Sequence, residues 1–322
     1  MKRTLRIAAT LVVLALALTY ILLKVDVRQS AQIFGEASPL WVVLSMSLIF
    51  VMIFPMAWRW QLLLRARGIR ERVLWLARAY FVGFAVGQVL PTSVGGDASR
   101  IYETVRRHPG QASPIAGSVL VERALGGVVT LVLAGIGFLL AIGRFPIGAY
   151  LWIEFIFAFG AIVLAVVFFS RRARQRLVIL VPLTRRLRVE RLARALYEGI
   201  HGYRNHPGTL AFVALTTLVV QTGGILSMYA AGRAVGIDVS LAAYIAFGPL
   251  LFLVTLVPFT INGLGVREAF FVSFLGKLDV APEAAFAAGF LFFLTTVLLA
   301  LPGLAVLLWD GVRRDRVPGR AT

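Results

Sequence analysis

Six apolar runs, each long enough to cross a bilayer as a helix, constrain this chain more than any other feature. Hydrophobic residues make up 59% of the 322 residues, and the mean hydropathy is +0.86. Such runs predict an all-α, polytopic helical membrane protein. The first run stays apolar well past its one small-x-small cleavage candidate, so we expect an uncleaved anchor. The predicted full spans are residues 7–23, 40–58, 115–142, 149–170, 209–231 and 285–309.

Basic residues concentrate in alternate connections between these runs. The formal net charge is +18, and arginine and lysine gather at residues 2–6, 59–78, 171–204 and 313–320. The other connections are nearly balanced, which is the pattern of the positive-inside rule and does not point to nucleic acid. We therefore expect both termini in the cytoplasm and no nucleic-acid partner. Cysteine is absent and the three histidines do not cluster, so we expect no metal and no cofactor.

A ten-residue phrase occurs twice, in the two apolar segments that remain. Residues 91–100 align without a gap to residues 258–267, and both copies follow Pro-x-[Ser/Thr]-[Val/Ile]-x-Gly-x-x-x-Arg. Proline and glycine interrupt helices, and transporters often place substrate sites where helices break at matching positions of two internal repeats. The phrase therefore marks candidate sites in both halves.

Length and charge predict that the first copy is a re-entrant hairpin over residues 79–108. Its apolar arm, residues 79–91, has 13 residues, or roughly 20 Å of helix against about 30 Å of hydrocarbon. Arginines flank both sides, so the hairpin would enter and leave at the cytoplasmic face. The second copy, residues 240–277, would mirror it from outside and complete an inverted repeat. Two full crossings, 240–258 and 264–276, remain an alternative there.

The phrase has the chemistry of an anion cradle. A helix that restarts at the glycines presents unpaired amides, to which a hydroxyl and an arginine one turn along add donors for a lipid phosphate. The simpler alternative is that proline and glycine only kink two helices and that the arginines reach headgroups. The candidate lipid- or anion-binding residues are Ser93, Gly95, Gly96, Arg100, Thr260, Asn262, Gly263, Gly265 and Arg267.

Carboxylates are available to neutralise these arginines in the membrane. Helical spacing places Asp97 and Glu103 on either side of Arg100, and Glu268 follows Arg267 directly. Glu122 and Arg123 form a third charged pair, either inside the bilayer or at its surface. Glu122 is the candidate for proton coupling, because acidic side chains reach less far toward water than arginine.

Two arginine-rich segments have interleaved apolar residues. Residues 171–208 predict a cytoplasmic amphipathic linker that contacts an anionic leaflet, and residues 60–77 have a similar composition. The alternative is that these basic residues only orient the protein in the membrane.

The sequence also resembles a known family. Gln88 to Pro91, Gly95-Gly96-Asp97, Arg100, Val121-Glu122-Arg123 and Asn262 to Glu268 are similar, in order, to the lysylphosphatidylglycerol synthase transmembrane family, also called flippase-like. The resemblance implies one transmembrane domain over residues 1–322, about eight helical segments, and a bacterial or archaeal cytoplasmic membrane. Members often carry Asn where this chain has Gln88. The sequence ends at Thr322, directly after its last run, so we expect no synthase activity.

The resemblance implies a transporter or flippase that moves an anionic or modified, phosphate-bearing lipid between leaflets. A lipid-linked glycosyltransferase is one alternative, although no Asp-x-Asp pair occurs. A scaffold subunit that binds a lipid-synthesis enzyme is another. The expected partner in the first case is a membrane phospholipid or glycolipid. No Gly-x-x-x-x-Gly-Lys-[Ser/Thr] loop is present, so the chain carries no such nucleotide-hydrolysis site.

Overall fold

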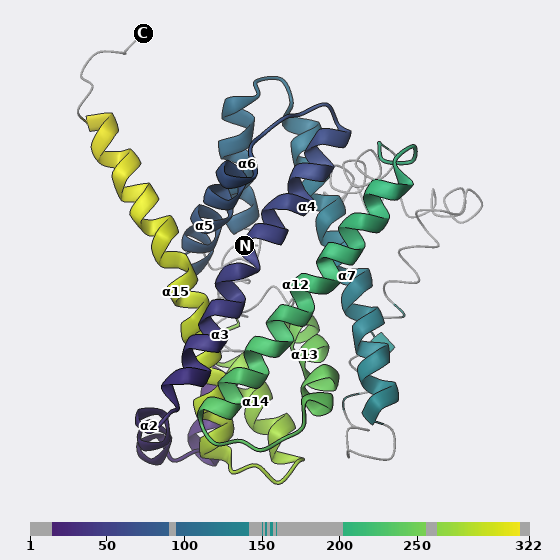
Figure 1. Cartoon of the computed structure of the whole chain (residues 1–322). Helices are drawn as coiled ribbons and strands as arrows, with labels where there is room; N and C mark the ends of the chain where they lie inside the picture. Colours follow the sequence, from purple (N-terminus) through teal and green to yellow (C-terminus); the bar gives the residue numbers. More distant parts are fainter. Residues whose placement is uncertain are drawn as a thin grey trace, which may run out of the picture.

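The computed structural model describes a bundle of helices without strands over residues 15–89, 95–141, 202–255 and 263–315, with isolated residues between 150 and 159 (Figure 1). Residues 15–24 are also helical. The labelled helices are α2 (Val27–Gly35), α3 (Pro39–Val51), α4 (Ile53–Ala66), α5 (Val73–Val89), α6 (Gly95–Arg107), α7 (Ala112–Ala141), α12 (Pro207–Ala234), α13 (Leu241–Thr255), α14 (Val266–Gly276) and α15 (Pro282–Asp315).

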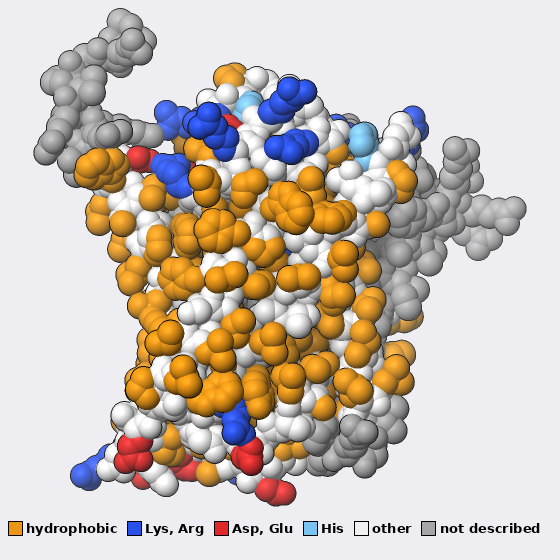
Figure 2. All heavy atoms as spheres, viewed as in Figure 1, with side chains coloured by type: hydrophobic (Ala, Val, Ile, Leu, Met, Phe, Trp, Pro, Cys, Tyr) orange, Lys and Arg blue, Asp and Glu red, His pale blue; other side chains and the backbone are white. Residues whose placement is uncertain are grey.

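Among the described residues, four helical stretches are long and apolar enough to span a membrane: Pro39–Ala66, Ala112–Ala141, Pro207–Ala234 and Pro282–Asp310. They coincide with four of the six predicted spans, and they confirm the prediction of a polytopic helical membrane protein. A broad apolar belt covers the side of the molecule in Figure 2, as lipid contact requires. Of the other predicted spans, 7–23 is described only from residue 15, and 149–170 lies almost wholly outside the described residues.

The first long stretch is jointed at Met52, where α3 ends and α4 begins. Pro55 explains the joint, because it has no N–H to donate to the carbonyl of Val51, four residues earlier. Beyond the joint, α4 continues to Ala66 and α5 starts at Val73. Residues 60–77, whose composition resembles that of the predicted linker, therefore do not form one helix, since their first half extends a span and their second half begins another helix.

The two ends of the bundle differ in charge. Figure 2 shows arginine and lysine side chains gathered at one end and most acidic side chains at the other. We call them the basic end and the acidic end. At the basic end, the Tyr203 hydroxyl donates to the Leu63 carbonyl at 2.8 Å and ties the start of α12 to α4. Burial raises the pKa of this hydroxyl above its usual value.

Helices α5 and α6 form an antiparallel hairpin whose open ends lie at the basic end (Figure 1). Arg107, at the end of α6, bonds Glu71 before α5 at 2.6 Å, and Arg78 bonds Glu103 at 3.2 Å. Helices α13 and α14 pair in the opposite direction near the acidic end, where the Phe247 ring contacts the rings of Phe270, Phe271 and Phe274.

The described parts of all four arms are short. They contain 17, 13, 15 and 11 residues, or roughly 16 to 26 Å of helix against about 30 Å of hydrocarbon. The first arm begins at Val73, six residues before the predicted start.

Helix α15 connects the two hairpins because it contacts both α14 and α5. A side chain at Gly303 would lie 1.9 Å from the Phe81 carbonyl oxygen, so only glycine permits this approach of α15 to α5. Gly289 similarly faces Phe271 of α14. The largest buried apolar cluster lies among α12 to α15, and a second lies among α4, α5 and α7.

Candidate functional site

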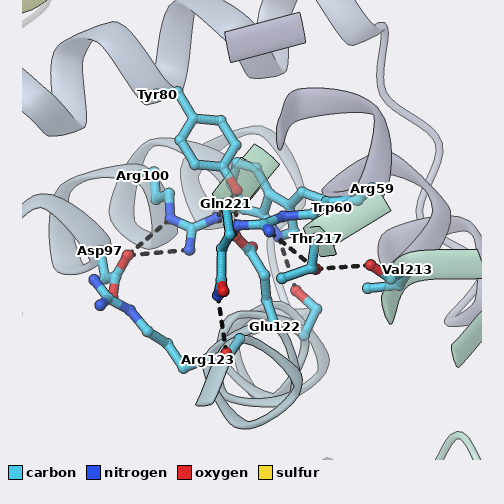
Figure 3. A network of polar contacts seen from close by, with 12 residues as sticks. Arg59, Trp60, Tyr80, Asp97, Arg100, Glu122, Arg123, Val213, Thr217 and Gln221 are labelled. Atoms are coloured by element: carbon cyan, nitrogen blue, oxygen red, sulfur yellow. Dashed lines mark hydrogen bonds and ion pairs between the residues drawn. The ribbon is translucent and has the colours of Figure 1, made fainter. Parts of the chain in front are cut away.

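A buried carboxylate, Glu122 of α7, is the centre of the most extensive polar network in the described residues (Figure 3). Its side chain is only 4% exposed. Its Oε1 accepts a hydrogen bond from Arg59 Nη2 and one from the Tyr80 hydroxyl, both at 2.6 Å. Its Oε2 accepts from Arg100 Nη1 at 2.8 Å. One carboxylate therefore joins α4, α5, α6 and α7.

The Arg100 guanidinium is enclosed on several sides. Its Nε and Nη2 lie 3.1 and 3.0 Å from Asp97 Oδ1, and its Nη1 donates to the Tyr80 hydroxyl at 2.9 Å. It also lies 4.6 Å from the ring centroids of Trp60 and Tyr80, a cation–π arrangement. Trp60 is itself fixed, because its Nε1 donates to Ser118 Oγ at 2.9 Å. The arginine of the repeated phrase is thus held by fixed partners.

Arg59 extends the network to α12. Its Nη1 donates to Thr217 Oγ1 at 3.0 Å, and Thr217 in turn donates to the Val213 carbonyl at 2.7 Å. One turn further along α12, Gln221 donates to Thr130 Oγ1 at 2.8 Å and to the Gly126 carbonyl at 3.0 Å, both on α7. Figure 3 shows these side chains converging between the helices.

Two glycines allow α6 to bring Arg100 into this position. An added Cβ at Gly96 would lie 2.5 Å from the Gly83 carbonyl oxygen, and one at Gly83 would lie 2.9 Å from the Gly96 oxygen. The backbones of α5 and α6 therefore touch where they cross. One turn beyond Gly96, Arg100 then faces α7.

The network is close to electrically neutral. Arg59 and Arg100 are opposed by Glu122 and by Asp97. A buried ion pair gives little net stability relative to a well-packed apolar core, but removing one partner leaves a charge uncompensated. An anion that entered this region could compete with Glu122 or Asp97 for the Arg100 donors. Both Glu122 oxygens are occupied, so a proton could bind there only by displacing a donor.

Two predicted pairings differ from the observed ones. Glu103 does not flank Arg100; it bonds Arg78, which also pairs with Asp310 of α15. Glu122 and Arg123 lie on different sides of α7, where Glu122 is buried and the Arg123 side chain is 49% exposed. Arg123 Nε donates to Asp97 Oδ2 at 2.7 Å. The sequence left the depth of the Glu122-Arg123 pair open, and the structure separates its two members.

Arg123→Ala should therefore cost little stability, because the ion pair that it breaks lies at the surface. We expect the free energy of unfolding to fall by at most about 1 kcal/mol. Thermal unfolding of the purified protein in detergent would test this. A loss of several kcal/mol would mean that Arg123 is part of the buried network.

The second copy of the phrase places its charges differently. Gly263 and Gly265 have φ angles of +76° and +78°. Residues with a side chain rarely adopt such angles, so glycine allows the chain to turn into α14 here. The Gly265 N–H donates to Glu268 Oε2 at 2.6 Å, so Glu268 caps its own helix. Arg267 is 5% exposed and lies within 5.6 Å of the ring centroids of Phe292 and Phe293.

The inner parts of the two hairpins meet on one residue of α15. Gln88 Nε2, near the end of α5, donates to the Thr296 carbonyl at 3.1 Å. Arg267 Nη1, near the start of α14, lies 3.5 Å from Thr296 Oγ1. Thr296 is the middle residue of the 29-residue span Pro282–Asp310. The two broken elements thus approach each other halfway along the helix that connects them.

Several predicted site residues lie outside the described residues. Ser93, Thr260 and Asn262 are among them, with both prolines of the phrase and residues 171–201 of the predicted linker. Gly95, Gly96, Asp97 and Arg100 all lie in α6, whose described residues begin at Gly95. Within the described ranges, no group of three or more His, Asp or Glu could hold a metal ion.

Sequence reasoning missed Arg59, Trp60, Tyr80 and Thr217 as members of the network. Arg59 is the first of six arginines after an apolar run, so it was grouped with the surface charges. The position of Glu122 inside a predicted span does indicate a buried arginine, because an acidic residue inside a span needs a buried cation. That rule asks for a partner for Glu122 but does not say which arginine supplies it.

Comparison with known proteins agrees with the helical architecture. No curated protein matches the chain. Residues 6–303 match a family described as the lysylphosphatidylglycerol synthase TM region. The match covers nearly the whole sequence and both copies of the phrase, so this multi-pass membrane protein belongs to the lysylphosphatidylglycerol synthase transmembrane-region family.

Proposed function

We propose that this protein moves an anionic, phosphate-bearing lipid between the leaflets of the membrane. The single observation that carries the proposal is the meeting of two oppositely directed helix hairpins at Thr296, in the middle of α15. Inverted elements that break near the membrane midplane are typical of transporters whose substrate site lies between the two halves.

The buried arginines supply the chemistry of the proposed site. Arg100 and Arg267 occupy matching places in the two copies, and both are at most 5% exposed. A lipid phosphate offers acceptor oxygens for a guanidinium, so it could replace the carboxylate partners of Arg100 during passage. In this proposal, entry of the headgroup displaces Glu122 or Asp97 from Arg100 and loosens α6 from α7.

The proposed location is a bacterial or archaeal cytoplasmic membrane, with the basic end toward the cytoplasm. The charge difference between the two ends supports this orientation through the positive-inside rule. Helix α15 ends at the basic end, so the C-terminus would be cytoplasmic. Hairpin α5–α6 would then open to the cytoplasm and hairpin α13–α14 to the outside.

Thr296→Val tests the proposed meeting point with a small change. Valine keeps the size and branching of threonine and removes the hydroxyl near Arg267. Thr295→Val is a matched control, because Thr295 makes the same bond to a carbonyl three residues earlier, at 2.7 Å. We expect Thr296→Val to slow leaflet exchange by about tenfold, the equivalent of one lost charge-assisted hydrogen bond, with Thr295→Val near wild type.

The measurement is leaflet exchange of fluorescent lipids in vesicles that contain the purified chain, with anionic and zwitterionic headgroups tested separately. Arg267→Gln should slow exchange at least as much as Thr296→Val. Absence of exchange for every phosphate-bearing lipid would reject the proposed function. Equal effects of the two threonine variants would reject Thr296 as part of the path.

A further inference from the structure

A hollow at the basic end, outside the buried network, lies at the mouth of the first hairpin. It is lined by Arg70, Arg72, Leu74, Trp75, Arg107 and His108, together with Glu71. These residues come from the segment that leads into α5 and from the end of α6. The hollow therefore bridges the two arms of the hairpin where they leave the apolar belt.

A buried carboxylate positions the cationic side of the hollow. The Glu71 side chain is 6% exposed, and its Oε1 accepts from Arg107 Nε at 2.6 Å and lies 3.0 Å from His108 Nε2. Gln61 of α4 holds the same segment through a bond to the Glu71 carbonyl at 2.6 Å. Arg107 also lies 4.7 Å from the Trp75 ring centroid. These contacts fix the direction of the Arg107 side chain. An arginine that only orients the protein in the membrane through its charge would not need a fixed direction.

The hollow keeps an excess of positive charge. Three arginines face one carboxylate there, and Arg70, Arg72 and Arg107 are all exposed. Arg107 donates to Glu71 through Nε, and the N–H groups on its two Nη atoms are further donors of the kind that suits a phosphate.

An apolar surface adjoins these donors. Leu74 is 73% exposed beside the half-buried Trp75, and both lie in the first turn of α5. Tryptophan is favoured where a membrane meets water because it has an apolar body and a polar N–H. A ligand with a phosphate and acyl chains would satisfy both parts of the hollow, whereas a soluble phosphate would satisfy one.

We propose that this hollow is an interfacial binding site for the phosphate of an anionic membrane lipid, separate from the buried Arg100 network. Arg72 and Arg107 hold the phosphate, and Leu74 and Trp75 contact the start of the acyl chains. A lipid bound there links the two arms of the α5–α6 hairpin. Binding of a lipid in this hollow does not require that the protein transports lipid, so the test of this site is independent of the test of the proposed function.

The test measures binding of a short-chain phosphatidylglycerol to the full chain in non-ionic detergent, by native mass spectrometry. We expect Arg72→Ala with Arg107→Ala to weaken binding about tenfold to a hundredfold. Arg65→Ala with Arg106→Ala is the matched control, because both are exposed arginines of the same end that do not line the hollow. The control should change binding by less than about threefold, since exposed charges are screened by salt.

Each other outcome is informative. Equal weakening in the two double variants would show attraction by overall charge and overturn the site, and so would no weakening in either. Glycerophosphoglycerol, the headgroup without chains, should compete poorly; competition as strong as that of the lipid would overturn the lipid assignment. Arg107→Lys keeps the charge and loses the planar fork, so it should weaken binding even if the double variant folds poorly.

Discussion

Replacing Glu122 with alanine should lower the free energy of unfolding by about 3 to 5 kcal/mol, the loss expected when one partner is removed from a buried ion cluster. Arg59 and Arg100 would both remain in place, 8% and 3% exposed, without the carboxylate that they share. The Tyr80 hydroxyl would also lose its acceptor. Thermal unfolding of the purified protein in detergent, followed by circular dichroism, measures the effect.

Glu103→Ala is the matched control for this measurement. Glu103 is also a helical carboxylate bonded to an arginine, but its side chain is 20% exposed and its partner Arg78 is 30% exposed. We expect a loss of at most about 1 kcal/mol there. A second check combines Glu122→Gln with Arg59→Met. The double variant should lose less stability than the sum of the two single variants, because each substitution removes the charge that the other would leave unpaired. Equal losses for Glu122→Ala and Glu103→Ala would contradict the buried network.

The membrane spans were predictable because hydropathy depends on local composition. The predicted run 115–142 corresponds to α7, Ala112–Ala141, and the run 285–309 lies within α15. The prediction was weaker where a helix continues past its apolar part. Helix α4 runs to Ala66 and carries Arg59 into the interior, because Glu122 and Thr217 on neighbouring helices supply acceptors. A charge count along the chain cannot separate such an arginine from one at the surface.

The duplicated phrase predicted two helix pairs in matching positions, and the structure contains both. Their different surroundings could not be predicted from the phrase. Arg100 meets a carboxylate from α7, whereas Arg267 lies against aromatic rings and a threonine of α15. Those partners are separated from the arginines by 20 to 30 residues of sequence, and only the packing of helices brings them together. The same local motif therefore has different contacts in its two copies.

Gly83→Ala and Gly96→Ala should each disrupt the first hairpin and release Arg100 from Glu122. The added methyl group would lie 2.9 Å from the Gly96 oxygen in one case and 2.5 Å from the Gly83 oxygen in the other. Backbone atoms cannot move aside as a flexible side chain would, so α5 and α6 must separate. Overpacking costs about 1 to 3 kcal/mol, and displacing Arg100 adds to that loss because the guanidinium leaves both Glu122 and Asp97.

Gly87→Ala is the control inside the same hairpin. Its methyl group would lie 3.9 Å from the Gly96 nitrogen, an ordinary contact, and alanine favours a helix over glycine by up to about 1 kcal/mol. It should therefore leave stability unchanged or raise it. Because the chain has no cysteine, spin labels can be attached at Leu74→Cys on α5 and Tyr102→Cys on α6, both exposed positions. The distance between the labels should increase with Gly83→Ala or Gly96→Ala and stay constant with Gly87→Ala. The same distance in all three variants would mean that backbone contact at Gly83 and Gly96 does not set the position of Arg100.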